Sequence, residues 1–168
     1  GLKSTCRDIN SLQKFVGIDI EEKIFNILKA SINLNINKSI LEELDKMDIR
    51  AVTCMSDDYP KKLLDLPNPP LILYCKGNVS LLNSSRLFAI VGSRKTLPSI
   101  MARAESFSKE LSESNVTLVT GLAEGVDSAV IKGALKSGNI ISILPGGFKH
   151  VYPEFNRALF EQVSENGL

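Results

Sequence analysis

Three short polar turns hold the residues of this chain that are best suited to bind an anion. The first turn, Gly92-Ser93-Arg94, follows an apolar run at residues 87–91. A glycine there lets another group approach the backbone closely, the serine offers a hydroxyl, and the arginine guanidinium fits the geometry of a phosphate. Strand, glycine turn and following helix together are typical of an anion site. The pattern therefore predicts phosphate binding at this turn.

Two later turns repeat the arrangement. The β-branched run at residues 116–120 ends at Gly121-Leu122-Ala123, and the run at residues 140–144 ends in Pro145-Gly146-Gly147. Small residues in the second turn let a backbone cradle a phosphate, but they also let a helix pack close to a sheet. Both interpretations of the second turn stay open at this point.

The segments between the turns indicate a parallel sheet. Apolar runs alternate with helical segments, one of which includes Ala129, Ile131 and Leu135 and stops at Gly138. This alternation is typical of βαβ units with right-handed crossovers, so we predict an α/β fold. Ligands bind beyond the carboxyl ends of such strands, and the three turns should therefore converge. The uninterrupted apolar run before Gly92 predicts a strand that is buried on both faces.

The beginning of the chain is predicted to be helical. One amphipathic segment begins at Asp19 or Glu21, and Asn37 to Ser39 can cap a second one. The result should be a small helical subdomain.

Short strands and proline-rich breaks follow the helical region. Residues 50–54 and 71–77 are predicted to be strands, and prolines interrupt the pattern between them. We place the domain boundary close to residues 55–60. The predicted domains are residues 1–55, a small helical domain of SAM-like or helix-hairpin-like type, and residues 56–168, with a last helix over residues 154–165.

Composition limits the partners and the compartment. With 20 Lys and Arg against 19 Asp and Glu, the net charge of +1 gives no bulk affinity for polyanions, so nucleic-acid binding needs a local patch. Cys6, Cys54 and Cys75 are scattered and odd in number. This pattern predicts a reduced cytoplasmic protein without a structural metal. No apolar run is as long as a membrane span, and the first residues lack a secretory pattern.

Several single residues invite a functional interpretation. His150 is the only histidine and has no Ser or Cys partner in any motif, so we predict no catalytic role for it. Asp127 falls in the first turn of a predicted helix, where the helix dipole favours a carboxylate, and we expect a structural role. Phe148, Tyr152 and Phe155 could stack on nucleic-acid bases. For Tyr152 and Phe155 we expect core packing instead.

A set of short motifs resembles the DNA-processing protein A (DprA/Smf) family from about residue 57 to the last residue. No single motif is specific, but their order and spacing together are. The residues that carry the resemblance are Tyr59-Pro60 and Leu63; Pro69-Pro70-Leu71-Ile72-Leu73-Tyr74 and Lys76-Gly77; Val91-Gly92-Ser93-Arg94; Gly121-Leu122-Ala123; Gly125-Val126-Asp127; Gly133-Ala134-Leu135; and Tyr152-Pro153 with Asn156.

The resemblance implies a fold and a function. It implies an extended Rossmann-like domain that binds single-stranded DNA, protects incoming DNA and helps to load the RecA recombinase in natural transformation. It also implies a homodimer, without catalytic activity or cofactor. On this basis, and from the turn chemistry, the residues expected to contact DNA or phosphate are Gly92, Ser93, Arg94, Gly121, Leu122, Ala123, Phe148 and Lys149.

The family domain continues with further strands and helices beyond the point that corresponds to Leu168. We therefore expect a C-terminally truncated parallel sheet with an uncovered edge strand, or a chain completed by a partner.

The sequence departs from the family pattern at three positions. Glu124 stands where the family usually has arginine, Ile131 where it has histidine, and Ile100 where it has glycine. A negative charge beside a phosphate site should weaken DNA binding, so Glu124→Arg is expected to tighten it at low salt. The alternative is that Glu124 points away and pairs with Lys132 or Arg94.

Other functional classes remain as alternatives. Phosphoribohydrolase-like enzymes with a Rossmann-type core share the Pro-Gly-Gly stretch, but they continue with Gly-Thr and a catalytic glutamate where this chain has Phe148-Lys149-His150. A dinucleotide-binding oxidoreductase is disfavoured because neither GxGxxG nor a P-loop motif occurs. A relative that has lost DNA binding and serves as an interaction module is the third possibility.

Overall fold

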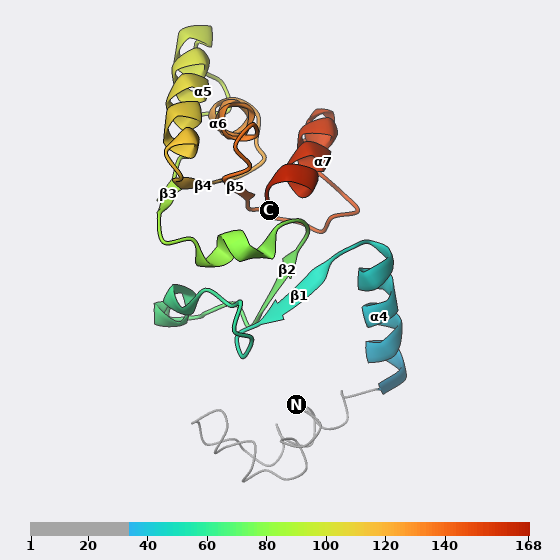
Figure 1. Ribbon diagram of the computed structural model, residues 1–168. Coiled ribbons are helices and arrows are strands. Elements are labelled where there is room, and N and C mark those ends of the chain that lie inside the picture. The colour runs from blue at the N-terminus through green and yellow to red at the C-terminus, as the bar shows by residue number, and fades with distance from the viewer. Residues whose placement is uncertain (1–33) are drawn as a thin grey trace. The chain divides into compact units, whose positions relative to one another are not determined.

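The computed structural model describes residues 34–168 (Figure 1). The chain forms two units, Gly1–Met47 and Asp48–Leu168. The amphipathic segment predicted from Asp19 or Glu21 lies outside the described residues. In the first unit, helix α4 spans Leu34–Lys46. Its predicted start at Asn37 to Ser39 is wrong, because the helical i, i+4 spacing of apolar residues already includes Ile36.

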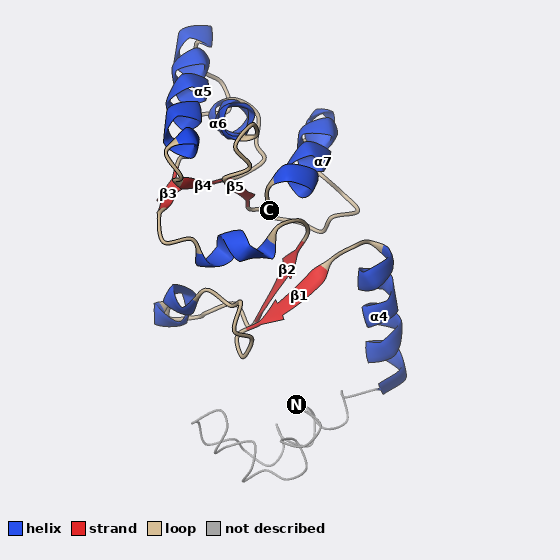
Figure 2. Cartoon of the chain, in the orientation of Figure 1, coloured by secondary structure: helices blue, strands red, loops and turns tan. Residues whose placement is uncertain are grey.

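The second unit contains two small sheets (Figure 2). Strands β1 (Arg50–Thr53) and β2 (Ile72–Cys75) pair antiparallel. Strands β3 (Leu87–Ala89), β4 (Thr117–Thr120) and β5 (Ile140–Ser142) form a parallel sheet in the order β3-β4-β5. All five predicted strands are thus confirmed. Strand β1 belongs to the second unit, where it pairs with β2.

Two helices connect the strands of the parallel sheet, α5 (Pro98–Glu113) between β3 and β4 and α6 (Val126–Ala134) between β4 and β5, and α7 (Arg157–Asn166) follows β5. Short 3-10 helices lie at η1 (Lys61–Asp65), η2 (Val79–Asn83) and η3 (Glu154–Asn156). The alternation of strands and helices confirms the predicted α/β class. Among residues 34–168, none of the helices is both long and apolar enough to cross a lipid bilayer.

The parallel sheet has a hydrophobic core on each face. Leu118 and Ile140, which are register partners, belong to the core beneath α6 and α7, whereas their neighbours Val119 and Ile141 pack with β1, β2 and η2. Figure 1 shows the three helices on one side of the sheet and the β1–β2 pair on the other. The period of two along a strand explains why one strand contributes to both cores.

Small residues bring α5 and α6 into close contact. Ser108 and Ser112 are fully buried, and a Cβ atom added to Gly133 would lie 2.1 Å from the Oγ of Ser108. The Oγ of Ser112 donates to the carbonyl of Ala134 at 3.3 Å. Any larger residue at Gly133 would therefore push the two helices apart.

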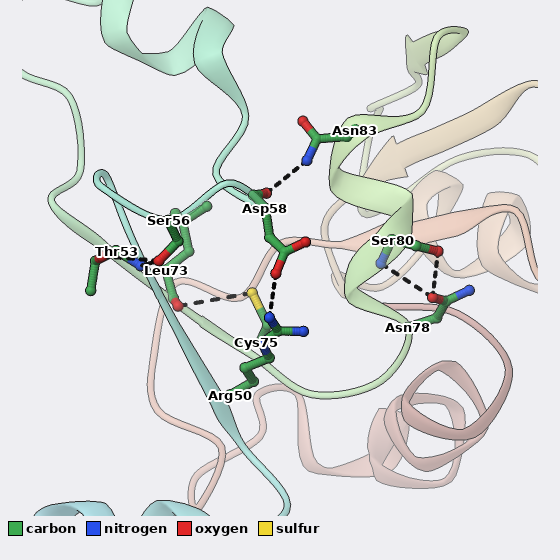
Figure 3. A network of polar contacts seen from close by, with 9 residues as sticks. All are labelled: Arg50, Thr53, Ser56, Asp58, Leu73, Cys75, Asn78, Ser80 and Asn83. Atoms are coloured by element: carbon green, nitrogen blue, oxygen red, sulfur yellow. Dashed lines mark hydrogen bonds and ion pairs between the residues drawn. The ribbon is translucent and has the colours of Figure 1, made fainter.

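A polar network fixes the turns around the β1–β2 pair (Figure 3). The Arg50 guanidinium forms an ion pair with Asp58, and the Nδ2 of Asn83 donates to the Asp58 carbonyl at 2.9 Å. The Asn78 side chain accepts from the N–H and the hydroxyl of Ser80 and so caps η2. Through Asp58, these contacts link Asn83 of η2 to Arg50 of β1.

The expectation that the first strand is buried on both faces is wrong. In β3, Leu87 is 40% exposed and Phe88 is 49% exposed, because among the described strands β3 pairs only with β4. On the other side of the sheet, the N–H of Leu168 donates to Ile140 and its carbonyl accepts from Ser142, which is the pattern of a parallel bridge beside β5. Among the described strands, β3 therefore forms the edge of the parallel sheet that has no neighbour.

Candidate functional site

The first turn presents two cations at the carboxyl end of β3. Arg94 and Lys95 are exposed, and the structure gives neither side chain a polar partner within residues 34–168. The hydroxyl of Ser93 donates to the Lys95 carbonyl at 2.7 Å and accepts from the Lys95 N–H at 3.2 Å. Ser93 therefore shapes the turn, while the two basic side chains are available to an anion. Lys95 was not among the predicted residues, although its charge and position could have indicated it.

The first turn packs directly against the start of α6. Gly125 precedes the helix with φ of 86°, and a Cβ atom there would lie 2.3 Å from the Ser93 carbonyl oxygen. A Cβ atom on Gly92 would meet the Val126 side chain at 2.7 Å. The N–H of Val126 donates to Ser93 at 3.2 Å, so this donor of the helix N-terminus is already used within the protein.

Asp127 joins the first two turns from beneath. Its carboxylate is buried and accepts from the Gly92 N–H at 3.4 Å. The same carboxylate lies 2.6 Å from the place where a Cβ on Gly121 would be. Gly121 thus makes room for a buried acid at the helix N-terminus, which agrees with the structural role expected for Asp127.

The second turn is held from below by a residue that sequence reasoning did not select. The Nδ2 of Asn156 donates to the Leu122 carbonyl at 2.8 Å and to the Ser128 hydroxyl at 3.0 Å, and that hydroxyl donates to Ala123 at 2.6 Å. Asn156 is buried in η3. Its place in the Tyr-Pro motif was the signal that could have identified it.

These bonds orient the backbone of the second turn. The carbonyls of Leu122 and Ala123 face inward, and none of the hydrogen bonds described for residues 34–168 uses the N–H of either residue. Leu122 is only 2% exposed and its side chain lies in the core, whereas Ala123 is partly exposed, so the N–H of Ala123 is the donor of this turn that suits an anion. The structure thus brings the first and second turns together, and it links the second turn to η3, which follows the third.

The third turn is open. Gly146 and Gly147 have no neighbouring atoms where a Cβ would be placed, and Lys149 and His150 are exposed. Phe148 is partly buried, and its ring lies 6.0 Å from that of Phe160 between centroids. Phe148 therefore belongs at least in part to the core beneath α7, which leaves less of its face for a base.

The expectation of core packing for Tyr152 and Phe155 is wrong. Tyr152 is 71% exposed and Phe155 is 66% exposed. The short η3 turns Asn156 inward to reach Leu122, which places the preceding residue Phe155 on the outside. The sequence interpretation had assigned both aromatic rings to the interior, but both are exposed, and Phe155 shares a groove with Glu124 and Gly125, which follow the second turn.

The departures from the family pattern have different surroundings. Ile131 lies fully buried in the core, and Ile100 lies exposed in the first turn of α5. Glu124 is exposed, and the structure shows no ion pair between it and Lys132 or Arg94. Among residues 34–168, no three His, Cys, Asp or Glu side chains gather where they could hold a metal ion.

The sequence pattern of DNA recombination-mediator protein A matches residues 50–168. The chain belongs to this family. The match includes every strand of both sheets and all three turns.

Curated relatives of the chain carry the names of this family. DNA processing protein DprA of Bacillus subtilis is 29% identical over 128 residues, which are 76% of this chain and 43% of that protein. Protein Smf of Synechocystis is 33% identical over 132 residues, which are 76% of this chain and 33% of that protein. The chain therefore spans less than half the length of these relatives.

Solved structures of the family share the fold. The X-ray structure of DprA from Streptococcus pneumoniae superposes with a TM-score of 0.71 at 26% identity, covering 88% of this chain and half of that one. DprA from Helicobacter pylori, whose structure describes a single-stranded DNA binding mode, gives a TM-score of 0.62 at 25% identity over 70% of this chain and 52% of that one. These matches confirm the Rossmann-like fold implied by the sequence resemblance.

Proposed function

We propose that this chain binds single-stranded DNA through the surface formed by its first and second turns. The observation that carries the proposal is the pair of exposed cations, Arg94 and Lys95, which have no polar partner within the described residues. The unused N–H of the partly exposed Ala123 lies in the adjoining turn, and phosphate contacts from basic side chains and from backbone N–H groups are both common in DNA binding. The Helicobacter pylori relative, which binds single-stranded DNA, supports the same ligand.

The fold supplies two further elements for this ligand. Tyr152 and Phe155 present exposed rings, and stacking of bases on aromatic rings tolerates every base. The small net charge of +1 means that affinity comes from this local surface and not from the whole molecule. Gly92, Gly121 and Ser93 then shape the site, while the Arg94 side chain and the N–H of Ala123 contact the DNA strand.

At the level of the whole protein we propose the role of the family. The chain would then contribute to a cytoplasmic recombination mediator that protects incoming single-stranded DNA and helps to load RecA during natural transformation, as a homodimer and without catalysis. Membership of the DNA recombination-mediator family supports this proposal.

A competition experiment tests the binding proposal. A labelled single strand bound to the chain is displaced by unlabelled single-stranded or duplex DNA of the same length. We expect the single strand to compete better, because a duplex hides its bases from Tyr152 and Phe155. Equal or stronger competition by the duplex would contradict the proposal, and absence of binding to either would favour an interaction module without DNA affinity.

A further inference from the structure

A groove beside the second turn is lined by residues from α6 on one side and from η3 and α7 on the other. Its volume is about 450 Å³. Gly125, Ser128 and Lys132 follow the helical spacing along one wall, and Phe155, Leu159 and Gln162 follow it along the other. Glu124 lies at the end nearest the first turn, and Met101, Asn156 and Ala158 complete the lining.

The floor of the groove is apolar or already satisfied. Leu159 is buried, and the polar groups of Ser128 and Asn156 are bonded to each other and to the second turn. The rim of the groove, in contrast, carries exposed polar side chains. Glu124, Lys132 and Gln162 are exposed, and within residues 34–168 none of their side-chain polar groups has a partner. A flat ligand that enters this groove would therefore meet free hydrogen-bonding groups only at its edge.

The groove adjoins the proposed phosphate contact. The backbone of Gly125 is so close to the first turn that a Cβ atom on it would lie 2.7 Å from the Arg94 carbonyl oxygen. Phe155, two-thirds exposed, lines the opposite wall. A DNA strand whose phosphate is held by Arg94 thus has an aromatic face and an acidic rim within reach of a neighbouring base.

We propose that this groove takes a single unpaired nucleobase that carries an exocyclic amine, with Phe155 against the ring and the Glu124 carboxylate accepting the amine hydrogen bond. A carboxylate accepts from an amine such as that of cytosine, whereas thymine presents a carbonyl oxygen at the same ring position. This inference rests on the proposed DNA-binding function and adds base selectivity to it. It also gives Glu124 a positive role where the sequence comparison predicts only repulsion.

Two homopolymers of equal length test the inference. Oligo-dC and oligo-dT are both pyrimidine strands with the same number of phosphates, so the ratio of their dissociation constants cancels the shared phosphate attraction. At neutral pH we expect the unaltered chain to bind oligo-dC about fivefold more tightly, as one hydrogen bond to a charged acceptor at a partly open site implies. Equal affinities would overturn the inference while leaving the proposed function standing.

Two variants separate the rim from the wall. Glu124→Gln keeps the size of the side chain and replaces the carboxylate by a neutral amide, which can accept from the cytosine amine or donate to the thymine carbonyl. The dC preference should therefore fall to near unity while oligo-dT binds as well or better. Phe155→Ala should weaken both homopolymers by about fivefold or more through lost stacking. Phe107→Ala, another exposed aromatic residue on α5 outside the groove, is the matched control and should change neither.

The outcomes distinguish the two proposals. A dC preference that survives Glu124→Gln would overturn the inference, and so would wild-type binding of both strands by Phe155→Ala. Absence of binding to either homopolymer would contradict the DNA-binding proposal itself. Circular dichroism of each variant verifies that these exposed substitutions leave the fold intact.

Discussion

The second and third turns contain similar small residues but have opposite surroundings. A Cβ atom on Gly121 in the second turn would meet Asp127, and one on Gly125 at the helix start that follows would meet Ser93. In the third turn, Gly146 and Gly147 have open space where a side chain would be. Packing therefore requires glycine at Gly121 and Gly125 but not at Gly146 and Gly147.

The largest expected effect is that of Gly125→Ala. The added methyl group meets the Ser93 carbonyl at 2.3 Å, and the residue must keep a φ of 86°. Strained backbone and overpacking each cost about 1–3 kcal/mol, so the free energy of unfolding should fall by about 3 kcal/mol or more. Urea unfolding followed by circular dichroism measures this loss.

Gly146→Ala is the matched control for that substitution. The same methyl group enters open space, and the free energy of unfolding should change by no more than about 0.5 kcal/mol. If Gly125→Ala and Gly146→Ala lower the free energy of unfolding by similar amounts, the two turns do not differ in packing as described.

The hydrogen bonds that Asn156 makes to the second turn are expected to stabilise it, and a substitution can remove them. Asn156→Ala leaves the Leu122 carbonyl and the Ser128 hydroxyl without their buried donor, which should cost about 1–3 kcal/mol. Asn166→Ala is the control, since Asn166 is exposed and donates only to the carbonyl of Gln162 one turn earlier in α7. If the melting temperatures of the two variants fall by equal amounts, the hydrogen bonds of Asn156 do not stabilise the second turn.

A smaller change in the free energy of unfolding is expected from pH, through Cys75 of β2, which lies in the core between the parallel sheet and the β1–β2 pair. Burial raises the pKa of the Cys75 thiol, and the positive charge of Arg50 lowers it in part. The folded state therefore holds this proton more tightly than the unfolded state does, and the resulting stability is complete at neutral pH. It is lost as pH rises from the unfolded value of about 8.5 through the higher folded pKa.

The difference between the unaltered chain and Cys75→Ala isolates this contribution, because every other titrating group is common to both. Their free energies of unfolding, measured from pH 7 to pH 10, should converge as pH rises. A constant difference over that window would show that the thiol has the same pKa in both states.

The order of strands and helices could be predicted from local patterns. Runs such as residues 116–120 are β-branched and end in a glycine, and both properties depend only on neighbours in sequence. The exposure of β3 could not be derived in that way, because a buried and an edge strand share the same apolar run. Position in a sheet depends on which other segments pair, and β3 pairs only with β4 among the described strands.

The candidate site was predictable to a similar degree. Convergence of the first two turns follows from the carboxyl-end rule for parallel sheets, and the Asp127 carboxylate, which lies against both Gly92 and Gly121, confirms it. The tether of Asn156 to Leu122 joins residues 34 positions apart, so no local pattern contains it. The outward position of Phe155 follows from the inward position of Asn156, and the sequence interpretation missed both for the same reason.

The salt dependence of single-stranded DNA binding shows most directly whether Arg94 contacts phosphate at a site that the packed second turn shapes. Arg94→Ala removes one exposed cation, so its log–log plot of affinity against salt should be shallower by about 0.7, with unfolding unchanged. Arg86→Ala, an exposed arginine just before the other end of β3, should keep the original slope. An unchanged slope and affinity in Arg94→Ala would contradict the account and place the DNA contact elsewhere.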